Sequence, residues 1–174
     1  MDIESIEYHC IILAAGFGSR MKELGTDIPK CLLRIDHRTL LEIHLDNLIE
    51  HRIKNVTIVV GYKKEKIIRK IGSTYKNLKI KYVESNEYNS TNHSWSLFLT
   101  NQIIRDSCQP VLITHADNYY DPQLLSTLFE SPHEDVILVD PHYSIMTNDE
   151  LMVIGCDDVV GDLRYIYELS LIHI

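Results

Sequence analysis

Residues 8–20 of this 174-residue chain have the sequence YHCIILAAGFGSR. The apolar run over residues 8–14 stops at Gly16, a pattern typical of a strand that is buried on both faces of a sheet. Two glycines then flank Phe17, and glycine lets a main chain approach a ligand closely. The stretch therefore predicts a buried strand followed by a loop whose backbone N–H groups can converge on a phosphate.

The rest of the chain alternates between strand-like and helix-like patterns. Strands are predicted over 55–60, 79–83, 111–116 and 136–140, and helices over 39–51, 63–71, 94–105 and 121–130. This alternation predicts a three-layer α/β/α fold with a mostly parallel, Rossmann-like central sheet. Ligands of such sheets bind at the carboxyl ends of the strands, where residues 16–20, residues 61–63 and Asp117 are expected.

The pattern weakens after residue 150 to two strand-like pieces, 151–156 and 163–167. The last residues, LSLIHI over 169–174, resemble the translated adapter tail of an incomplete sequence assembly. We therefore expect one domain over residues 1–174 that is truncated at its C-terminus, with residues 168–174 foreign to it. A genuine short terminus is the alternative.

Charge is divided unevenly along the chain, whose formal net charge is −8. Residues 1–81 hold 15 Lys and Arg against 10 Asp and Glu, whereas residues 82–174 hold 2 against 15. The overall acidity argues against general nucleic-acid binding, which needs an excess of basic residues. The first half suits anionic ligands and the second half suits cationic ones.

Membrane and export signals are missing from the sequence. No apolar run approaches the roughly 18 residues that a membrane span requires, and the acidic N-terminus does not resemble a secretory signal. The four cysteines, Cys10, Cys31, Cys108 and Cys156, show no paired spacing. These features predict a protein of a reducing compartment, and we expect it in the cytoplasm.

Two well-known phosphate-binding motifs do not fit the glycine-rich loop. The dinucleotide-binding fingerprint needs a small residue where Met21 stands, and the Walker A pattern is absent. What remains is LAAGFGSRM over 13–21, followed by PKCLL over 29–33. This combination resembles the signature of the nucleotidyltransferases that activate sugar phosphates and phosphocholine.

Two further segments resemble the phosphocholine cytidylyltransferase branch of that family. They are VGYKKE over 60–65 and NEYNSTNHSWSL over 86–97. The resemblance covers residues 8 to 140 and implies the fold of the nucleotide-diphospho-sugar transferases. It also implies a reaction in which an acceptor phosphate or phosphonate oxygen attacks the α-phosphorus of a nucleoside triphosphate and expels pyrophosphate.

The resemblance assigns roles to residues of the loop. Arg20 and Lys30 are implied as catalytic cations that hold the triphosphate and neutralise charge at the reacting phosphate. The nucleotide is expected to contact Leu13, Ala14, Ala15, Gly16, Phe17, Gly18 and Ser19, together with Asn86, Thr91, Asn92 and Ser94 around the base. The alternatives are that the two cations are ordinary surface residues and that the Asn and Ser side chains satisfy their own loop.

Asp117 follows a predicted buried strand, where the family carries a carboxylate that holds Mg²⁺. Magnesium prefers hard oxygen ligands and rests on one or two carboxylates plus substrate phosphates. The alternative is that Asp117 only caps a turn. His115 is expected to pack at the strand end and not to bind metal.

The sequence departs from the family pattern in its last third. A second metal-binding carboxylate is not found, because Asp157, Asp158 and Asp162 come too early in the chain. Relatives often hold the acceptor phosphate with a lysine near residues 159–167, yet no lysine follows Lys81 and Arg164 is the cation available there.

For aromatic and basic residues outside the loop, ordinary packing or solvent exposure is the main expectation or the alternative. Tyr119, Tyr120 and Tyr143 could cradle a quaternary ammonium group, although ordinary packing is the alternative for each. Trp95 is expected in the core. The basic residues of the 63–71 helix are expected to form a solvated helix face.

Taken with the resemblance, the sequence predicts a Mg²⁺-dependent transfer of CMP from CTP, or of another nucleotide, to phosphocholine or a similar small phosphorylated amine. Sugar-1-phosphate nucleotidylyl transfer is the first alternative. A nucleotide-binding domain without catalysis is the second. The sequence leaves a homodimer open.

Overall fold

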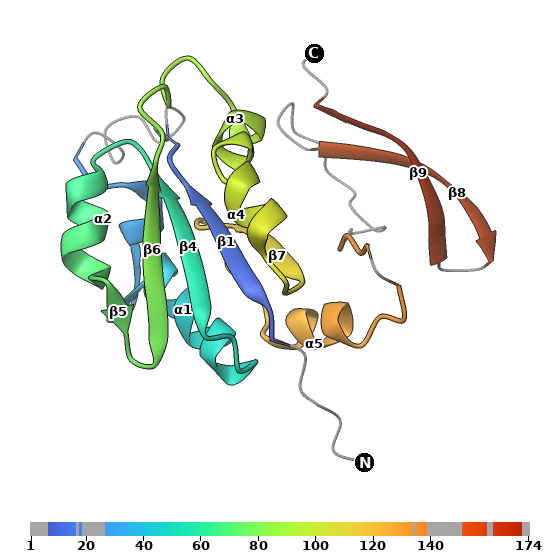
Figure 1. Cartoon of the computed structure of the whole chain (residues 1–174), viewed down its shortest axis with the longest axis horizontal. Coiled ribbons are helices and arrows are strands. Elements are labelled where there is room, and N and C mark those ends of the chain that lie inside the picture. Colours follow the sequence, from blue (N-terminus) through green and yellow to red (C-terminus); the bar gives the residue numbers. More distant parts are fainter. Residues whose placement is uncertain are drawn as a thin grey trace. The chain divides into compact units, whose positions relative to one another are not determined.

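The computed structural model describes residues 7–16, 18, 27–133, 135–138, 151–159 and 162–171, which fall into two compact units, 1–126 and 127–174. The first unit contains a five-stranded sheet with the order β5-β6-β4-β1-β7 (Figure 1). The second contains an antiparallel hairpin of β8 (Leu151–Val159) and β9 (Asp162–Leu171). Helix α5 (Gln123–Phe129) spans the boundary between the units.

The predicted parallel sheet is confirmed. Strand β1 (His9–Ala14) lies between β4 (Asn55–Val60) and β7 (Val111–His115), and both neighbours run parallel to it. Strand β6 (Leu78–Glu84) pairs in parallel with the far side of β4. The short strand β5 (Thr74–Tyr75), which the sequence pattern did not indicate, pairs antiparallel with β6 at the edge.

The core is built on both faces of β1 and β4, as their continuous apolar sequences predict. On one face, Ile11, Leu13 and Val59 pack together with partly buried residues that include Ile104. Side chains alternate along a strand, so Cys10 and Ile12 point to the opposite face, where both are also fully buried. Each fully buried side chain of this size contributes about 1.5–3 kcal/mol to folding.

The helices follow the predicted order, except that one predicted helix is divided into two. Helix α1 (Leu40–Glu50) and helix α2 (Lys64–Ile71) lie where the periodicity places them. The helix predicted over 94–105 is two helices, α3 (His93–Phe98) and α4 (Asn101–Asp106). The chain turns at the buried Thr100, whose hydroxyl donates to the carbonyl of Leu97 at 2.7 Å. Such side-chain bonds to the main chain compete with helix continuation.

One predicted strand differs from the structure, and residues 30–39 form short elements that were not predicted. Residues 31–35 form the 3₁₀ turn η2 (Lys30–Leu32) and the short strand β2 (Arg34–Ile35), which pairs with β3 (Arg38–Thr39). The strand predicted over 136–140 is not formed at 136–138, and 139–140 lie outside the described residues. Among the residues that the structure describes, no helix is long and apolar enough to cross a membrane.

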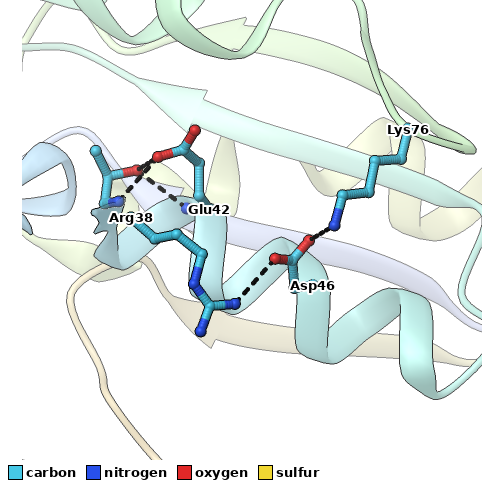
Figure 2. Close-up of polar contacts among 5 residues, drawn as sticks. Arg38, Glu42, Asp46 and Lys76 are labelled. Carbon is cyan, nitrogen blue, oxygen red and sulfur yellow. Dashed lines mark hydrogen bonds and ion pairs between the residues drawn. The ribbon is translucent and has the colours of Figure 1, made fainter. Parts of the chain in front are cut away.

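Helix α1 begins with a reciprocal capping box. The hydroxyl of Thr39 accepts from the backbone N–H of Glu42 at 3.2 Å, and the Glu42 carboxylate accepts from the backbone N–H of Thr39 at 2.9 Å. One turn further on, Asp46 lies between Arg38 and Lys76, at 3.2 Å and 2.6 Å (Figure 2). These contacts fix the helix that buries Leu41, Leu45 and Leu48.

The lysines of helix α2 and of the residue before it are partnered with acidic side chains. Lys63 and Lys66 both bind the carboxylate of Asp27, at 2.9 Å and 3.0 Å. Hydrogen bonds from these two lysines lower the pKa of Asp27 to about 2. The basic cluster is therefore a surface network of ion pairs, as the expected solvated helix face allows.

The capping box gives a stability prediction. Thr39→Val keeps the buried volume but removes the hydroxyl, so we expect it to lower the free energy of unfolding by about 1 kcal/mol. Urea unfolding followed by circular dichroism measures this change. Thr39→Ser keeps the capping hydroxyl, so its free energy of unfolding should fall clearly less. An equal decrease in the two variants would contradict the capping role.

Candidate functional site

A cavity of about 190 Å³ opens at the carboxyl ends of β1 and β7. Its walls come from the end of β1 and the loop after it, from η2, from α3 and from the end of β7. The lining residues are Leu13, Ala14, Ala15, Gly16, Gly18, Lys30, Cys31, His93, Ser96, His115, Ala116 and Asp117. Seven of these are residues that the sequence placed at the site, so the sheet brings most of the predicted loop, lysine and carboxylate together.

Asp117 is held at the cavity by the pairing of β7 with β1. Leu13 and His115 are register partners, and the backbone N–H of Ala116 donates to the carbonyl of Leu13 at 3.0 Å. Asp117 is the next residue, so its carboxylate emerges where the ladder ends. This is the placement that the sequence predicted from the buried strand before it.

Lys30 reaches the same cavity from a rigid turn. Pro29 is buried and accepts a backbone bond from Leu32 at 2.8 Å, while Lys30 accepts one from Leu33 at 3.1 Å. Cys31, between them, is buried, and burial raises the pKa of its thiol to about 12. The thiol is therefore neutral at physiological pH, which leaves Lys30 as the charged group of this turn.

The two charged groups meet in an ion pair. The ammonium Nζ of Lys30 lies 2.5 Å from Oδ2 of Asp117, and their side chains are 46% and 31% exposed. Burial opposes ionisation of Asp117, but the hydrogen bond and the charge of Lys30 outweigh it and lower the pKa of this carboxyl. Asp117 is consequently an anion at neutral pH, which is the state that binds metal.

Two histidines that the sequence analysis did not assign to the site line the cavity. His93 and His115 meet edge to face with ring centroids 4.5 Å apart. Burial, the neighbouring His93 and the charge of Lys30 lower the pKa of His115, although Asp117 acts the other way. His93 and Ser96 are three residues apart on α3 and so share one helix face, a spacing that was visible in the sequence.

Beside the cavity, glycine is favoured by backbone conformation at position 18 and required by close packing at position 61. Gly18 has φ +67°, a left-handed conformation that side chains disfavour. Gly61 follows β4, and a Cβ added there would lie 2.8 Å from the carbonyl oxygen of Ala15 and 2.9 Å from Cβ of Tyr88. The close approach allows the backbone N–H of Tyr62 to donate to that carbonyl at 3.2 Å. The segment over 61–63 thus supports the end of β1.

The residues expected around the base lie elsewhere. Thr91, Asn92 and Ser94 line an open depression with Asn89, Ser90, Trp95 and Phe98, and Asn86 is exposed and lines neither this depression nor the cavity. Asn92 caps α3 by accepting from the backbone N–H groups of Ser94 and Trp95. Phe17, Ser19 and Arg20 lie outside the described residues.

Trp95 is not in the core, contrary to expectation. Its ring is partly exposed and stacks on Phe98 at 5.3 Å between centroids, and Phe98 is 60% exposed. The two residues are one helical turn apart on α3, and the buried residue of that helix is Ser96. An apolar stripe at helical spacing therefore marks a surface here.

Of the three tyrosines considered for a cationic acceptor, the structure describes two. Tyr119 is 67% exposed, and Tyr143 lies outside the described residues. The Tyr120 ring meets the buried His44 ring edge to face, with centroids 5.3 Å apart. Its hydroxyl is buried, so Tyr120 anchors the segment after Asp117 in the core instead of facing a ligand.

Comparison with known proteins places this geometry in a family. The family model for MobA-like NTP transferase domains matches residues 10–157. The choline-phosphate cytidylyltransferase of Streptococcus pneumoniae is 29% identical over 161 residues, which cover 88% of this chain and 62% of that protein. The UTP–glucose-1-phosphate uridylyltransferase AglF of Haloferax volcanii is 33% identical over 84 residues, covering 48% of this chain and 35% of that protein.

A solved structure of the CTP:phosphocholine cytidylyltransferase from Streptococcus pneumoniae shares the fold. The TM-score is 0.60 at 23% identity, over 95% of this chain and 65% of that chain. This likeness supports the fold that the sequence predicted. The chain spans less than two thirds of the length of each of these relatives.

The contact at Gly61 predicts a steric requirement. Gly61→Ala should lower the free energy of unfolding by about 1–3 kcal/mol, because the new methyl group overlaps the Ala15 carbonyl and Tyr88. Urea unfolding measures the loss. Gly16→Ala is the matched comparison, since a Cβ there has nothing within 4 Å, and its stability should match that of the unmodified chain. Equal stability of all three proteins would refute the requirement.

The burial of His44 predicts a pH dependence of stability. Burial lowers the pKa of His44 from 6.5 to about 4, and neither ring nitrogen has a hydrogen-bond partner among the described residues. The unfolded chain therefore binds a proton at His44 more tightly than the folded chain does. The free energy of unfolding keeps its full value above pH 6.5 and falls as the pH drops toward 4. The total loss is about 3 kcal/mol at about 1.4 kcal/mol per pKa unit.

The variant His44→Leu isolates this contribution. It should be at least as stable as the unmodified chain at pH 7.5 and should lose less stability between pH 6.5 and pH 4. The measurement is urea unfolding across this range, with the exposed His37→Leu as control. Parallel pH profiles for His44→Leu and the unmodified chain would rule out the assignment.

Proposed function

Because the chain belongs to the family of MobA-like NTP transferase domains, we propose that it transfers CMP from CTP to phosphocholine or to a similar small phosphorylated or phosphonate amine, with release of pyrophosphate. The observation that carries the proposal is the pairing of Lys30 with Asp117 beside the glycine-rich end of β1. A cation and an anion held there suit a substrate that brings phosphates and a metal ion together.

The reaction brings two anions together and then builds negative charge on the leaving pyrophosphate. An oxygen of the acceptor phosphate bonds to the α-phosphorus, and the bond from that phosphorus to the bridging oxygen of pyrophosphate breaks. In this proposal, the loop from Gly16 to Arg20 holds the triphosphate, and Lys30 stabilises the charge that develops. Removing one such preorganised donor costs about 3–4 kcal/mol of transition-state stabilisation.

The cavity fits magnesium with one protein ligand. Asp117 offers hard carboxylate oxygens at the cavity, and the part of the chain that the structure describes has no group of three His, Cys, Asp or Glu side chains placed to bind a metal. Magnesium takes few protein ligands and completes its shell with water and substrate phosphates. We propose that Asp117 holds Mg²⁺, which when bound would neutralise phosphate charge.

The choice of acceptor and nucleotide is supported by the comparisons and by charge. One relative with long coverage, matched over 88% of this chain, is a choline-phosphate cytidylyltransferase. Residues 82–174 carry a net charge of −13, from 2 basic and 15 acidic residues, which suits a cationic acceptor. The second candidate is a sugar-1-phosphate nucleotidylyltransferase, which the 33% identity to a glucose-1-phosphate uridylyltransferase over 84 residues favours.

Pyrophosphate release separates these candidates. Each of CTP, UTP, GTP and dTTP is incubated with Mg²⁺ and with phosphocholine, 2-aminoethylphosphonate or glucose 1-phosphate. We expect CTP with phosphocholine or the phosphonate to give the fastest release. UTP with glucose 1-phosphate as the fastest pair would establish the second candidate. Tight CTP binding without turnover by any pair would indicate a nucleotide-binding domain without catalysis.

Lys30→Ala tests the role of the ammonium in this assay. We expect kcat to fall by at least about 100-fold, which corresponds to about 2.7 kcal/mol, with a smaller change in CTP affinity. Lys64→Ala is the matched control, because Lys64 makes an ion pair of the same 2.5 Å length with Glu84 away from the cavity. An unchanged kcat in Lys30→Ala would remove Lys30 from the mechanism.

A further inference from the structure

The Lys30–Asp117 ion pair joins the two groups that the proposed function assigns to different ligands. Lys30 is assigned to phosphate and Asp117 to a divalent cation, yet in this structure each is the other's partner at 2.5 Å. The ammonium of Lys30 therefore contacts the Asp117 carboxylate oxygen to which a metal ion would bind. Both side chains are partly exposed, so the contact can open without unfolding the chain.

We propose that Lys30 acts as a resident cation at Asp117, which keeps divalent cations off this carboxylate until the nucleotide phosphates draw the ammonium away. The metal then binds Asp117 together with the nucleotide and not before it. This inference rests on the proposed function, since it takes the nucleotide as the ligand that releases Lys30.

Electrostatics gives the direction of the effect. A divalent cation at Asp117 would lie close to the Lys30 ammonium, and two positive charges at such a distance repel each other even in water. The ammonium also cancels most of the attraction that Asp117 offers. A bound triphosphate removes both obstacles to metal binding, the repulsion by Lys30 and the neutralisation of Asp117. Its negative charge attracts the ammonium and the metal together.

Among the described residues that line the cavity, no second carboxylate and no second ammonium or guanidinium group stands beside the pair. Among the residues that line the cavity, Asp117 is the carboxylate and Lys30 the cationic side chain. The remaining titratable residues of this lining are Cys31, which is buried, the exposed His93 and the partly buried His115. By contrast, Asp46 is shared between Arg38 and Lys76 and would keep one cation if the other were removed. Removing Lys30 therefore leaves Asp117 with no ammonium or guanidinium partner among the described lining residues, and Mn²⁺ binding can measure the effect.

The experiment measures Mn²⁺ binding to the protein without nucleotide. Mn²⁺ takes the same oxygen ligands as Mg²⁺, and the loss of its free-ion signal in electron paramagnetic resonance reports binding. We expect Lys30→Met to bind Mn²⁺ roughly tenfold more tightly than the unmodified chain, because the repelling ammonium is gone. The double variant Lys30→Met with Asp117→Asn should lose this gain.

A matched control is Lys64→Met, which frees the exposed Glu84 from an ion pair of the same length. It should leave Mn²⁺ affinity unchanged, because Glu84 does not line the cavity in which Asp117 lies. Circular dichroism and urea unfolding verify that each variant is folded. Equal Mn²⁺ affinity of Lys30→Met and the unmodified chain would overturn the proposal, and so would a gain that persists in the double variant.

A second measurement separates this inference from the proposed function. Equilibrium dialysis with labelled CTP is carried out in EDTA and in Mg²⁺. We expect the unmodified chain to bind CTP in both conditions and Lys30→Met to lose most of its metal-free binding. If the unmodified chain binds no CTP in either condition, the proposed function and the nucleotide-driven release both fail. The Mn²⁺ comparison then still decides whether Lys30 blocks Asp117.

Discussion

The parallel pairing of β1 with β4 on one side and β7 on the other is the constraint on which the rest of the structure depends. Parallel strands end at the same edge of a sheet, so the loop after Ala15, the turn at Gly61 and the carboxylate of Asp117 converge there. These residues are separated by 46 and 56 positions in the chain. The register, held by apolar side chains on both faces, is what makes them neighbours.

At that edge of the sheet, tightly packed main chain lies beside a partly exposed ion pair. Gly61 lies so close to the end of β1 that a Cβ at this position would overlap the carbonyl oxygen of Ala15. The Lys30–Asp117 pair, in contrast, is partly exposed. A rigid frame with rearrangeable charges suits a site whose ligands are polyanions and metal ions, because the frame fixes position while the charges adapt to the ligand.

Sequence patterns located strongly periodic elements well and short elements poorly. Strands β1, β4, β6 and β7 were predicted because continuous or alternating apolar runs have few alternatives. The division of the 94–105 helix at Thr100 depends on a side-chain hydrogen bond that periodicity does not contain. The two-residue strand β5 exists through its pairing with β6, and two residues carry no pattern of their own.

The sequence by itself determined strands β1, β4, β6 and β7, helices α1 and α2, the glycine-rich loop and the chemical nature of Lys30 and Asp117, because each follows from local residue pattern or type. The tertiary structure alone decided that these two charges pair, that His93 and His115 line the cavity, and that Thr91, Asn92 and Ser94 lie at a separate depression. The reason is physical. Hydrophobic periodicity specifies which face of an element is buried, whereas contacts between side chains depend on register and on packing between elements far apart in the chain.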